Sequence, residues 1–343
     1  MIGLAAAFAA AGLGVAGFHW AALPLPWLLG PIFGCLLAAL AGAPLRGIDW
    51  LNDGMRTILG VAVGASLTPS VVAGLPALWP TLVLVPAMTL MIGLIGVPYF
   101  RRICGYDPAT AYYAAMPGGL QDMLAFGEEA GARGRALALI HATRVMVIVV
   151  ALPFILRGIW DADLTGAPGV PARSLEPVQL AWMVAAALVG WRAARRLGLP
   201  GASILGPLIL AGALTLAGAI GSRPPAEAIW AAQFFIGMTI GSKYAGITLE
   251  ELRRDVLAAV GFCAILIALT LVFVEPVVLF GLAPGREALL AFAPGGQAEL
   301  AVLALVAGAD MAFVVAHHLI RLFVVILGAP LVARRLTGTA PRD

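Results

Sequence analysis

Twelve hydrophobic segments, separated by short polar stretches, follow one another along the 343-residue chain, six in each half. In the first half they lie at residues 2–22, 27–43, 52–68, 76–100, 108–130 and 135–157, and in the second at 177–193, 201–220, 228–242, 255–280, 286–308 and 311–333. At about 1.5 Å of rise per residue, most of them are long enough as helices to cross a hydrocarbon core of roughly 30 Å. The pattern therefore predicts an all-α polytopic membrane protein.

The fifth segment of each half is more polar than the others and contains a Pro-Gly-Gly motif. The motifs and the polar residues after them are Pro117-Gly118-Gly119 with Gln121 and Asp122, and Pro294-Gly295-Gly296 with Gln297 and Glu299. A half-helix of about 8–11 residues on each side of the motif would reach roughly half of the bilayer. Because irregular backbone at that depth occurs only inside protein or beside a wet cavity, we expect each fifth segment to be a re-entrant broken helix.

The two halves are copies of one unit. Leu29-Gly30-Pro31 recurs as Leu205-Gly206-Pro207, at an offset of 176 in residue number, and the Pro-Gly-Gly motif recurs at an offset of 177. His141 and Arg144 have His318 and Arg321 as counterparts at the same offset of 177. Chance does not keep one register over so many Gly, Pro and polar positions, so the chain divides into a first membrane repeat at residues 1–157, an extramembrane linker at 158–175 and a second membrane repeat at 176–343.

The distribution of basic residues favours inverted repeats. If each fifth segment re-enters the membrane, each half has about five crossings and the second half is inverted. Fifteen of the 21 basic residues then lie on one side, among them Arg46, Arg56 and Arg101, and the other side has only Arg157, Arg173, Arg223 and Arg286. Full crossing by the fifth segments would abolish this bias. The positive-inside rule therefore predicts a multi-pass membrane protein with both termini cytoplasmic.

Composition supports a membrane protein and excludes several other classes. Hydrophobic residues make up 62% of the chain, charged residues only 11%, and the mean hydropathy is +0.99. A soluble domain has about 25% charged residues, so a disordered chain, a secreted disulfide scaffold and a nucleic-acid-binding domain are ruled out. Cys35, Cys104 and Cys263 have no metal-ligand spacing. The chain also lacks nucleophile, phosphate-loop, dinucleotide and zinc-protease motifs, and we expect no catalytic residue, no metal and no cofactor.

The residues around the two Pro-Gly-Gly motifs are the candidate binding site for a substrate or an ion. Broken helices in inverted repeats direct their dipoles and free backbone groups at a solute in secondary transporters. The candidates that lie on the broken helices themselves are the motif residues Pro117, Gly118, Gly119, Pro294, Gly295 and Gly296, the amides Gln121 and Gln297, and the acids Asp122 and Glu299. An acid at this depth could bind a cation, carry protons, or form a structural ion pair with Arg144 or Arg321.

His141 and Arg144 form a second candidate pair, copied by His318 and Arg321. Three residues apart, each pair lies on one face of its helix. Arg144 and Arg321 are the arginines expected inside spans, where a guanidinium can bind a carboxylate or another oxyanion and a histidine can titrate. The alternative is structural: the arginines neutralise Asp122 and Glu299, and the histidines donate to backbone carbonyls.

Two further repeated motifs concern helix geometry. The Leu-Gly-Pro motifs in the second segment of each half offer a second pair of helix breaks. Gly60-x3-Gly64 and its copy Gly237-x3-Gly241 are typical of helices that pack closely, and we interpret them as packing motifs rather than binding motifs.

Several quoted stretches resemble the AbrB family of bacterial membrane proteins, which carry a duplicated AbrB domain. They are Pro26-Trp27-Leu28-Leu29-Gly30-Pro31, Met116-Pro117-Gly118-Gly119-Leu120-Gln121-Asp122-Met123, Phe292-Ala293-Pro294-Gly295-Gly296-Gln297-Ala298-Glu299 and His318-x2-Arg321. The resemblance covers nearly the whole chain and implies an inner-membrane protein connected with regulation of gene expression. Members are often labelled as an ammonia monooxygenase or as an AbrB family regulator, and the resemblance supplies no established site residues.

Taken with the paired broken helices, the sequence predicts a secondary-transporter-like protein and not an enzyme. It would move a small solute, such as an organic anion or an amino-acid-like compound, coupled to H⁺ or Na⁺. The alternatives are a membrane-embedded sensor or regulator and a membrane subunit of a larger complex. The expected partners are the lipid bilayer, the solute and a coupling ion, without nucleic acid. A homodimer is compatible with this architecture, because elevator-type folds usually need a fixed scaffold.

Overall fold

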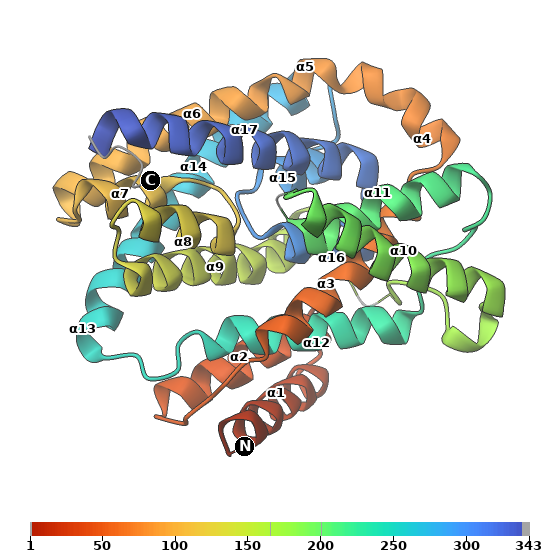
Figure 1. The fold of residues 1–343 in the computed structure, drawn as a ribbon, viewed down its shortest axis with the longest axis horizontal. Coiled ribbons are helices and arrows are strands. Elements are labelled where there is room, and N and C mark those ends of the chain that lie inside the picture. Colours follow the sequence, from red (N-terminus) through yellow and green to blue (C-terminus); the bar gives the residue numbers. More distant parts are fainter. Residues whose placement is uncertain (1, 165, 200, 338–343) are drawn as a thin grey trace. The chain divides into compact units, whose positions relative to one another are not determined.

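The computed structural model describes residues 2–164, 166–199 and 201–337, and this part of the chain is helical apart from loops and one isolated β-bridge between Val170 and Pro225. The helices of the first half are α1 (Ile2–Trp20), α2 (Pro26–Leu40), α3 (Asp49–Gly64), α4 (Pro69–Gly74), η1 (Leu75–Leu78), α5 (Trp79–Leu82), α6 (Leu84–Pro98), η2 (Tyr99–Ile103), α7 (Pro108–Ala115), α8 (Leu120–Glu129) and α9 (Gly134–Trp160) (Figure 1). Those of the second half are η3 (Ala172–Ser174), α10 (Pro177–Arg196), α11 (Ala202–Leu216), α12 (Ala226–Ser242), α13 (Leu249–Glu251), η4 (Leu252–Val256), α14 (Leu257–Leu279), α15 (Gly285–Phe292), α16 (Gln297–Val306) and α17 (Met311–Thr337).

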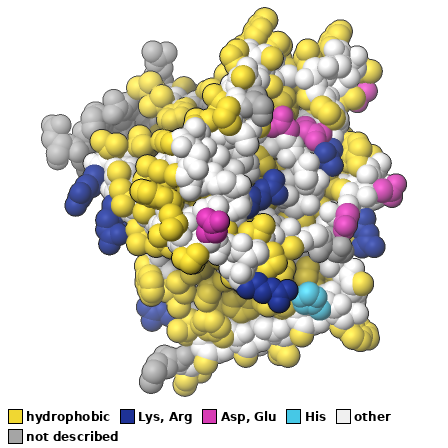
Figure 2. All heavy atoms as spheres, turned by 90° about the vertical axis from the view of Figure 1, so that its right-hand side faces the viewer, with side chains coloured by type: hydrophobic (Ala, Val, Ile, Leu, Met, Phe, Trp, Pro, Cys, Tyr) yellow, Lys and Arg dark blue, Asp and Glu magenta, His cyan; other side chains and the backbone are white. Residues whose placement is uncertain are grey.

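Five of the described helical stretches are long and apolar enough to cross a membrane. They are Ile2–Trp20, Val71–Ile103, Gly134–Trp160, Leu249–Leu279 and Met311–Ala333. Large apolar side chains on them are exposed, for example Leu90 on α6 and Leu271 on α14, which suits contact with lipid. Figure 2 shows one face of the molecule, where hydrophobic side chains cover much of the surface and charged side chains are scattered. The protein is an all-α polytopic membrane protein, as its sequence predicts.

The shorter apolar helices α2 and α11 have 15 residues each, which corresponds to about 22 Å. Both helices are followed by a glycine with a positive φ angle, 84° at Gly42 and 77° at Gly218. A glycine in this left-handed conformation after the last turn ends a helix. The two glycines are related by the same offset as the Leu-Gly-Pro motifs, so the helix ends are copies of one another.

The chain forms two compact units. Unit 1 contains Met1–Pro76, Val149–Ile247 and Ala298–Val315, and unit 2 contains Ala77–Ile148, Thr248–Gln297 and Ala316–Asp343. Each unit takes segments from both halves of the sequence, so the units do not coincide with the two repeats. The division at residues 157 and 176 is therefore a division of the sequence, and it stays a prediction.

Within unit 1, glycines bring helices from different halves into close contact. A Cβ atom on Gly60 of α3 would collide with the carbonyl oxygen of Ile204 on α11, and one on Gly237 of α12 would collide with the carbonyl oxygen of Leu28 on α2. The two contacts are copies of one another at offsets of 176 and 177. Because only glycine permits this approach, the two small-residue motifs serve packing, as their spacing predicts.

The Leu-Gly-Pro motifs are not helix breaks, and that expectation is wrong. Helices α2 and α11 continue through Pro31 and Pro207. Each proline is the sixth residue of its helix, so the backbone hydrogen bond that it removes belongs to the first turns. The preceding glycines serve packing, because a Cβ on Gly30 would lie 2.7 Å from the backbone nitrogen of Val15 on α1. The close helix pair keeps the backbone helical past the proline.

Within unit 2, the end of α6 and the start of α14 are joined by aromatic and hydrogen-bond contacts. The Tyr99 hydroxyl donates to the carbonyl oxygen of Ala258 at 2.9 Å, and the rings of Phe100 and Phe262 have centroids 4.8 Å apart. Helix α6 also packs against α7, and α14 packs against α15. The α6–α14 pair thus supports the first half of both broken helices.

Candidate functional site

Unit 2 contains both helix breaks that the Pro-Gly-Gly motifs predict. In the first half of the chain, α7 has 8 residues and α8 has 10, and Met116–Gly119 between them are not helical. In the second half, α15 has 8 residues and α16 has 10, with a non-helical stretch at residues 293–296. The half-helix lengths match the prediction. Each break creates a helix C-terminus with free carbonyls and a new N-terminus with free N–H groups.

A histidine replaces the hydrogen bond that each proline removes. In a continuous helix the carbonyl of Tyr113 would accept from the N–H of residue 117, but Pro117 has none. The Nε2 atom of His141 lies 3.0 Å from this carbonyl oxygen and, since a carbonyl can only accept, carries the donating proton. His318 makes the same 3.0 Å contact with the carbonyl of Leu290, which Pro294 leaves without a donor.

An arginine one turn further along binds the next free carbonyls. Arg144 of α9 is buried and donates from its two terminal nitrogens to the carbonyl oxygens of Met116 and Gly118, both at 2.9 Å. Arg321 of α17, also buried, donates to the carbonyl oxygen of Ala293 at 2.6 Å. The positive charges thus lie at the C-terminal ends of α7 and α15, where the helix dipoles are negative. We call each histidine with its arginine a clip.

The contacts of the clips can be compared with the two roles, binding or structural, that the sequence allows for these histidines and arginines. The histidines donate to backbone carbonyls, as in the structural alternative, whereas the guanidinium hydrogen bonds of the arginines go to carbonyls of the breaks.

Asp122 folds back over the start of its own half-helix. It is the third residue of α8, and a Cβ atom on Gly119 would lie 2.6 Å from its Oδ2. A carboxylate at this position stabilises the positive end of the helix dipole. The absence of a Cβ on Gly119 leaves room for the carboxylate in this position. Gln297 begins α16 and is half-buried, while the side chain of Gln121 lies outside the described residues.

Glu299 belongs to unit 1, unlike the other candidates. Its carboxylate is buried, and Oε1 lies 4.0 Å from a terminal nitrogen of Arg56 on α3. Arg56, which the charge distribution assigns to the basic side of the membrane, lies within α3, and 25% of its side chain is exposed. The sequence does indicate this position in a helix, since Arg56 falls within the predicted hydrophobic segment 52–68.

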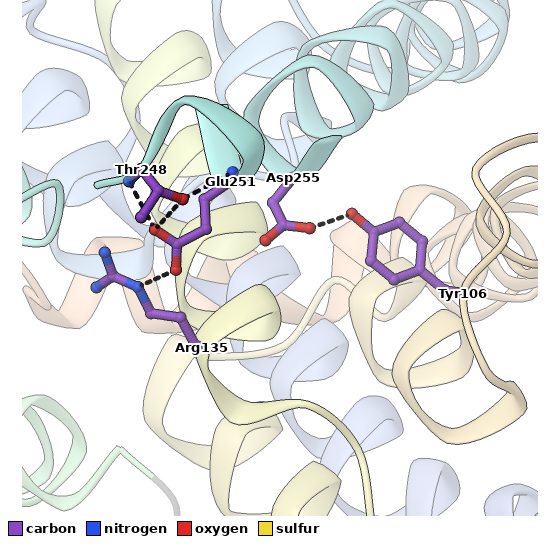
Figure 3. Close-up of polar contacts among 5 residues, drawn as sticks. All are labelled: Tyr106, Arg135, Thr248, Glu251 and Asp255. Atoms are coloured by element: carbon purple, nitrogen blue, oxygen red, sulfur yellow. Dashed lines mark hydrogen bonds and ion pairs between the residues drawn. The ribbon is translucent and has the colours of Figure 1, made fainter. Parts of the chain in front are cut away.

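One end of unit 2 is held by a polar cluster in which α9, α13 and η4 meet the turn at Tyr106 (Figure 3). The Tyr106 hydroxyl donates to Asp255 Oδ1 at 2.5 Å. Burial and this hydrogen bond raise the pKa of Tyr106, so the hydroxyl stays protonated. Arg135 donates to Glu251 at 2.9 Å, and Glu251 in turn caps α13 through Thr248. These contacts fix the start of α9, the helix that carries the first clip.

The described residues contain no group of three or more His, Cys, Asp or Glu side chains placed to hold a metal ion. The candidate site in unit 2 offers backbone groups freed at the breaks, the buried guanidinium groups of Arg144 and Arg321 and the carboxylate of Asp122. These groups can bind and release a charged solute.

Comparisons with known proteins agree with the resemblance seen in the sequence. Residues 27–337 match the family model described as transition state regulatory protein AbrB. An uncharacterized protein of Bacillus subtilis (strain 168), YhjN, is 28% identical over 334 residues, which cover 90% of this chain and 86% of YhjN. A protein of Escherichia coli (strain K12), whose name describes it as a candidate regulator, AbrB, is 26% identical over 333 residues, covering 95% of this chain and 94% of that protein. The matched region includes both helix breaks and both clips, and the chain belongs to the AbrB family.

Proposed function

We propose that the protein is a secondary transporter rather than an enzyme, and that it moves a small solute coupled to H⁺ or Na⁺. The observation that carries this proposal is the pair of matched helix breaks in unit 2, each held open by the same His–Arg clip. Keeping two breaks in the membrane has an energetic cost that a purely structural helix avoids. Paired broken helices are the usual means by which transporters present backbone groups to a solute.

The charges of the site suggest the class of solute. Arg144 and Arg321 lie near the breaks, and the N–H groups at the start of α8 and α16 add partial positive charge. An organic anion or an amino-acid-like compound with a carboxylate fits this environment. Asp122, folded over Gly119, would hold the ammonium group of such a compound or carry the coupling cation.

The proposed location is the inner (plasma) membrane of a bacterium, with both termini cytoplasmic, and the proposed partners are the lipid bilayer, the solute and a coupling ion. The proposal includes inverted repeats. Cysteines placed singly at Arg133 and Asp310, two exposed positions related by the repeat offset, test this point after the native cysteines are replaced. Labelling from opposite sides of the membrane would support inversion, and labelling from the same side would contradict it.

Transport is tested on the purified full-length chain in lipid vesicles. Amino acids and small mono- and dicarboxylates are first screened for those that raise the melting temperature, and each of these is then offered as a labelled solute under a Na⁺ or a pH gradient. We expect gradient-driven accumulation of at least one compound. Binding without accumulation under either gradient would contradict the proposal.

Variants at the first break connect such transport to the site. Asp122→Asn should abolish uptake and leave a folded protein, and Gly119→Ala should reduce uptake because its Cβ displaces the carboxylate. Gly54→Ala is the matched control, since a Cβ there meets nothing within 4 Å. Unchanged uptake by Asp122→Asn would contradict the role of Asp122, and loss of the folded protein would instead favour a structural role.

A membrane-embedded regulator is the second candidate, because the matched family model and the Escherichia coli relative both carry a regulatory name. A regulator would bind the solute without net flux. The same vesicle experiment separates the two functions, since a regulator shows the melting-temperature shift without accumulation of the solute.

A further inference from the structure

Helix α3 of unit 1 carries a short polar face among apolar turns. Asn52 and Arg56 are one turn apart, so they share a face of the helix, and Asp53 lies beside them. Asn52 is only 5% exposed. Arg56 points toward Glu299 of α16, whose side chain is 3% exposed. Asn52, Asp53, Arg56 and Glu299 thus form a polar cluster within unit 1.

Three atoms of this cluster are shielded from solvent and have no hydrogen-bond partner among the described residues. They are Oδ1 of Asn52, Oδ1 of Asp53 and Nε of Arg56. Buried polar atoms are nearly always paired, and each exception asks for an explanation such as a bound ion or water. Two of the three atoms are oxygens that can only accept, so the missing partner is a donor or a cation.

The charges of the cluster do not balance. Asp53 and Glu299 contribute two negative charges, and Arg56 contributes one positive charge. The distance of 4.0 Å between Arg56 and Glu299 is longer than a charge-assisted hydrogen bond of about 2.7–2.9 Å, so the pair is not closed. With both carboxylates ionised, the formal charges of the cluster leave one negative charge, which a bound cation would neutralise.

The ionisable residues of α3 in this cluster have no ionisable counterparts in the second half of the chain. The positions that correspond to Asn52, Asp53 and Arg56 at the offset of 177 are Ile229, Trp230 and Gln233. The packing of α3 on α11 and of α12 on α2 is otherwise matched between the halves. Close packing therefore does not require the polar residues, and their presence points to a ligand.

We propose that Asn52, Asp53 and Glu299 bind a monovalent cation, Na⁺, through their side-chain oxygens, with Arg56 limiting the charge of the site to one. Oxygen ligands suit a hard cation, and a net charge of −1 suits a monovalent rather than a divalent ion. A role of this site in ion coupling rests on the proposed transport function. The binding of Na⁺ itself can be measured without transport.

The test measures the melting temperature of the full-length protein in detergent with NaCl, KCl or choline chloride at equal ionic strength. We expect Na⁺ to raise the melting temperature in a saturable manner relative to choline. Asp53→Asn and the nearly isosteric Asn52→Leu should raise the half-saturating Na⁺ concentration by at least about tenfold, the loss typical of a damaged metal site. Glu250→Gln, on an exposed residue of unit 2, is the control that should keep the wild-type response.

Asp53→Glu provides a second measurement if Asn52→Leu fails to fold, since it keeps the charge, changes the reach and should also weaken Na⁺ binding. A wild-type protein without a Na⁺-specific shift, or a shift that survives in both Asp53→Asn and Asp53→Glu, would overturn the site. A stability that responds to pH and not to Na⁺ would also overturn it, because a proton would then compensate the charge. A retained Na⁺ shift in a protein that moves no solute would leave the site intact and contradict the transport function instead.

Discussion

His141 donates from Nε2 to the carbonyl oxygen of Tyr113, the one carbonyl of α7 that Pro117 deprives of its helical partner. The bond joins two helices of the same half and recurs between His318 and Leu290. In both copies the proline opens the helix and the histidine, on the sixth segment of the same half, satisfies the carbonyl that is set free. The break is thus a stable feature of the fold and not a local distortion.

Removal of this histidine should destabilise the protein in a way that depends on the proline. His141→Ala leaves the Tyr113 carbonyl buried without a donor, at a cost of about 1–3 kcal/mol in the free energy of unfolding. Pro117→Ala restores an N–H at the break, so the double variant should recover part of this loss. Chemical denaturation in detergent measures both effects, and equal stabilities of the single and double variants would contradict the interpretation.

Replacement of Arg144 by lysine should reduce the stability of the protein. A lysine keeps the charge but cannot span the carbonyls of Met116 and Gly118 as the planar guanidinium does. We expect Arg144→Lys to lose one charged hydrogen bond, or about 1.5–3 kcal/mol, and to reduce any solute uptake. Arg321→Lys is the matched comparison and should be milder, because Arg321 donates to the single carbonyl of Ala293. The reverse order of stabilities would contradict this assignment.

The glycine contacts of unit 1 predict equal sensitivity in the two halves. Gly60→Ala and Gly237→Ala each place a methyl group against a backbone carbonyl on the facing helix, so each should destabilise by about 1–3 kcal/mol. Gly54→Ala lies on the same helix as Gly60 without a facing atom within 4 Å, and it should stabilise by about 0.5–1 kcal/mol through helix propensity. Thermal unfolding of the three variants measures these changes in stability. A Gly60→Ala variant as stable as the wild type would show that α3 and α11 can separate.

Asp107 should contribute stability that is lost in acid. Burial alone raises the pKa of Asp107, but the N–H of Thr110 and the nearby Arg133 outweigh this and leave the pKa lowered. Because the folded-state pKa of Asp107 lies below its unfolded-state pKa of about 4, Asp107 stabilises the protein at pH values above about 4. This stabilisation is lost as the pH falls through the folded-state pKa.

The variant Asp107→Ala tests this at the N-cap of α7. At neutral pH it should cost about 1 kcal/mol, and the difference from the wild type should narrow below about pH 4. Thr68→Ala removes an uncharged N-cap at α4, so its cost should not change with pH. If the difference in stability between Asp107→Ala and the wild type were constant over the same pH range, the role of Asp107 as an ionised N-cap would be contradicted.

The sequence by itself determined the helical membrane fold, the positions of the segments and the two helix breaks. Hydrophobic length decides which stretches are helical in a membrane, and proline followed by two glycines interrupts a helix whatever surrounds it. The repeat offset alone also pairs Gly60 with Gly237 and His141 with His318. These features depend on local chemistry and on register, both of which a sequence displays directly.

Only the tertiary structure decided what the polar side chains contact. Spacing placed His141 and Arg144 on one helix face but could not show that their partners are carbonyls at the end of α7 and in the break that follows it. It suggested breaks at Pro31 and Pro207, where close packing on neighbouring helices keeps the backbone helical. It also gave no indication that Arg56 of α3 lies 4.0 Å from the buried Glu299. The partner of a buried polar group is chosen by what the fold brings within about 3 Å, and that choice depends on residues far away in the sequence.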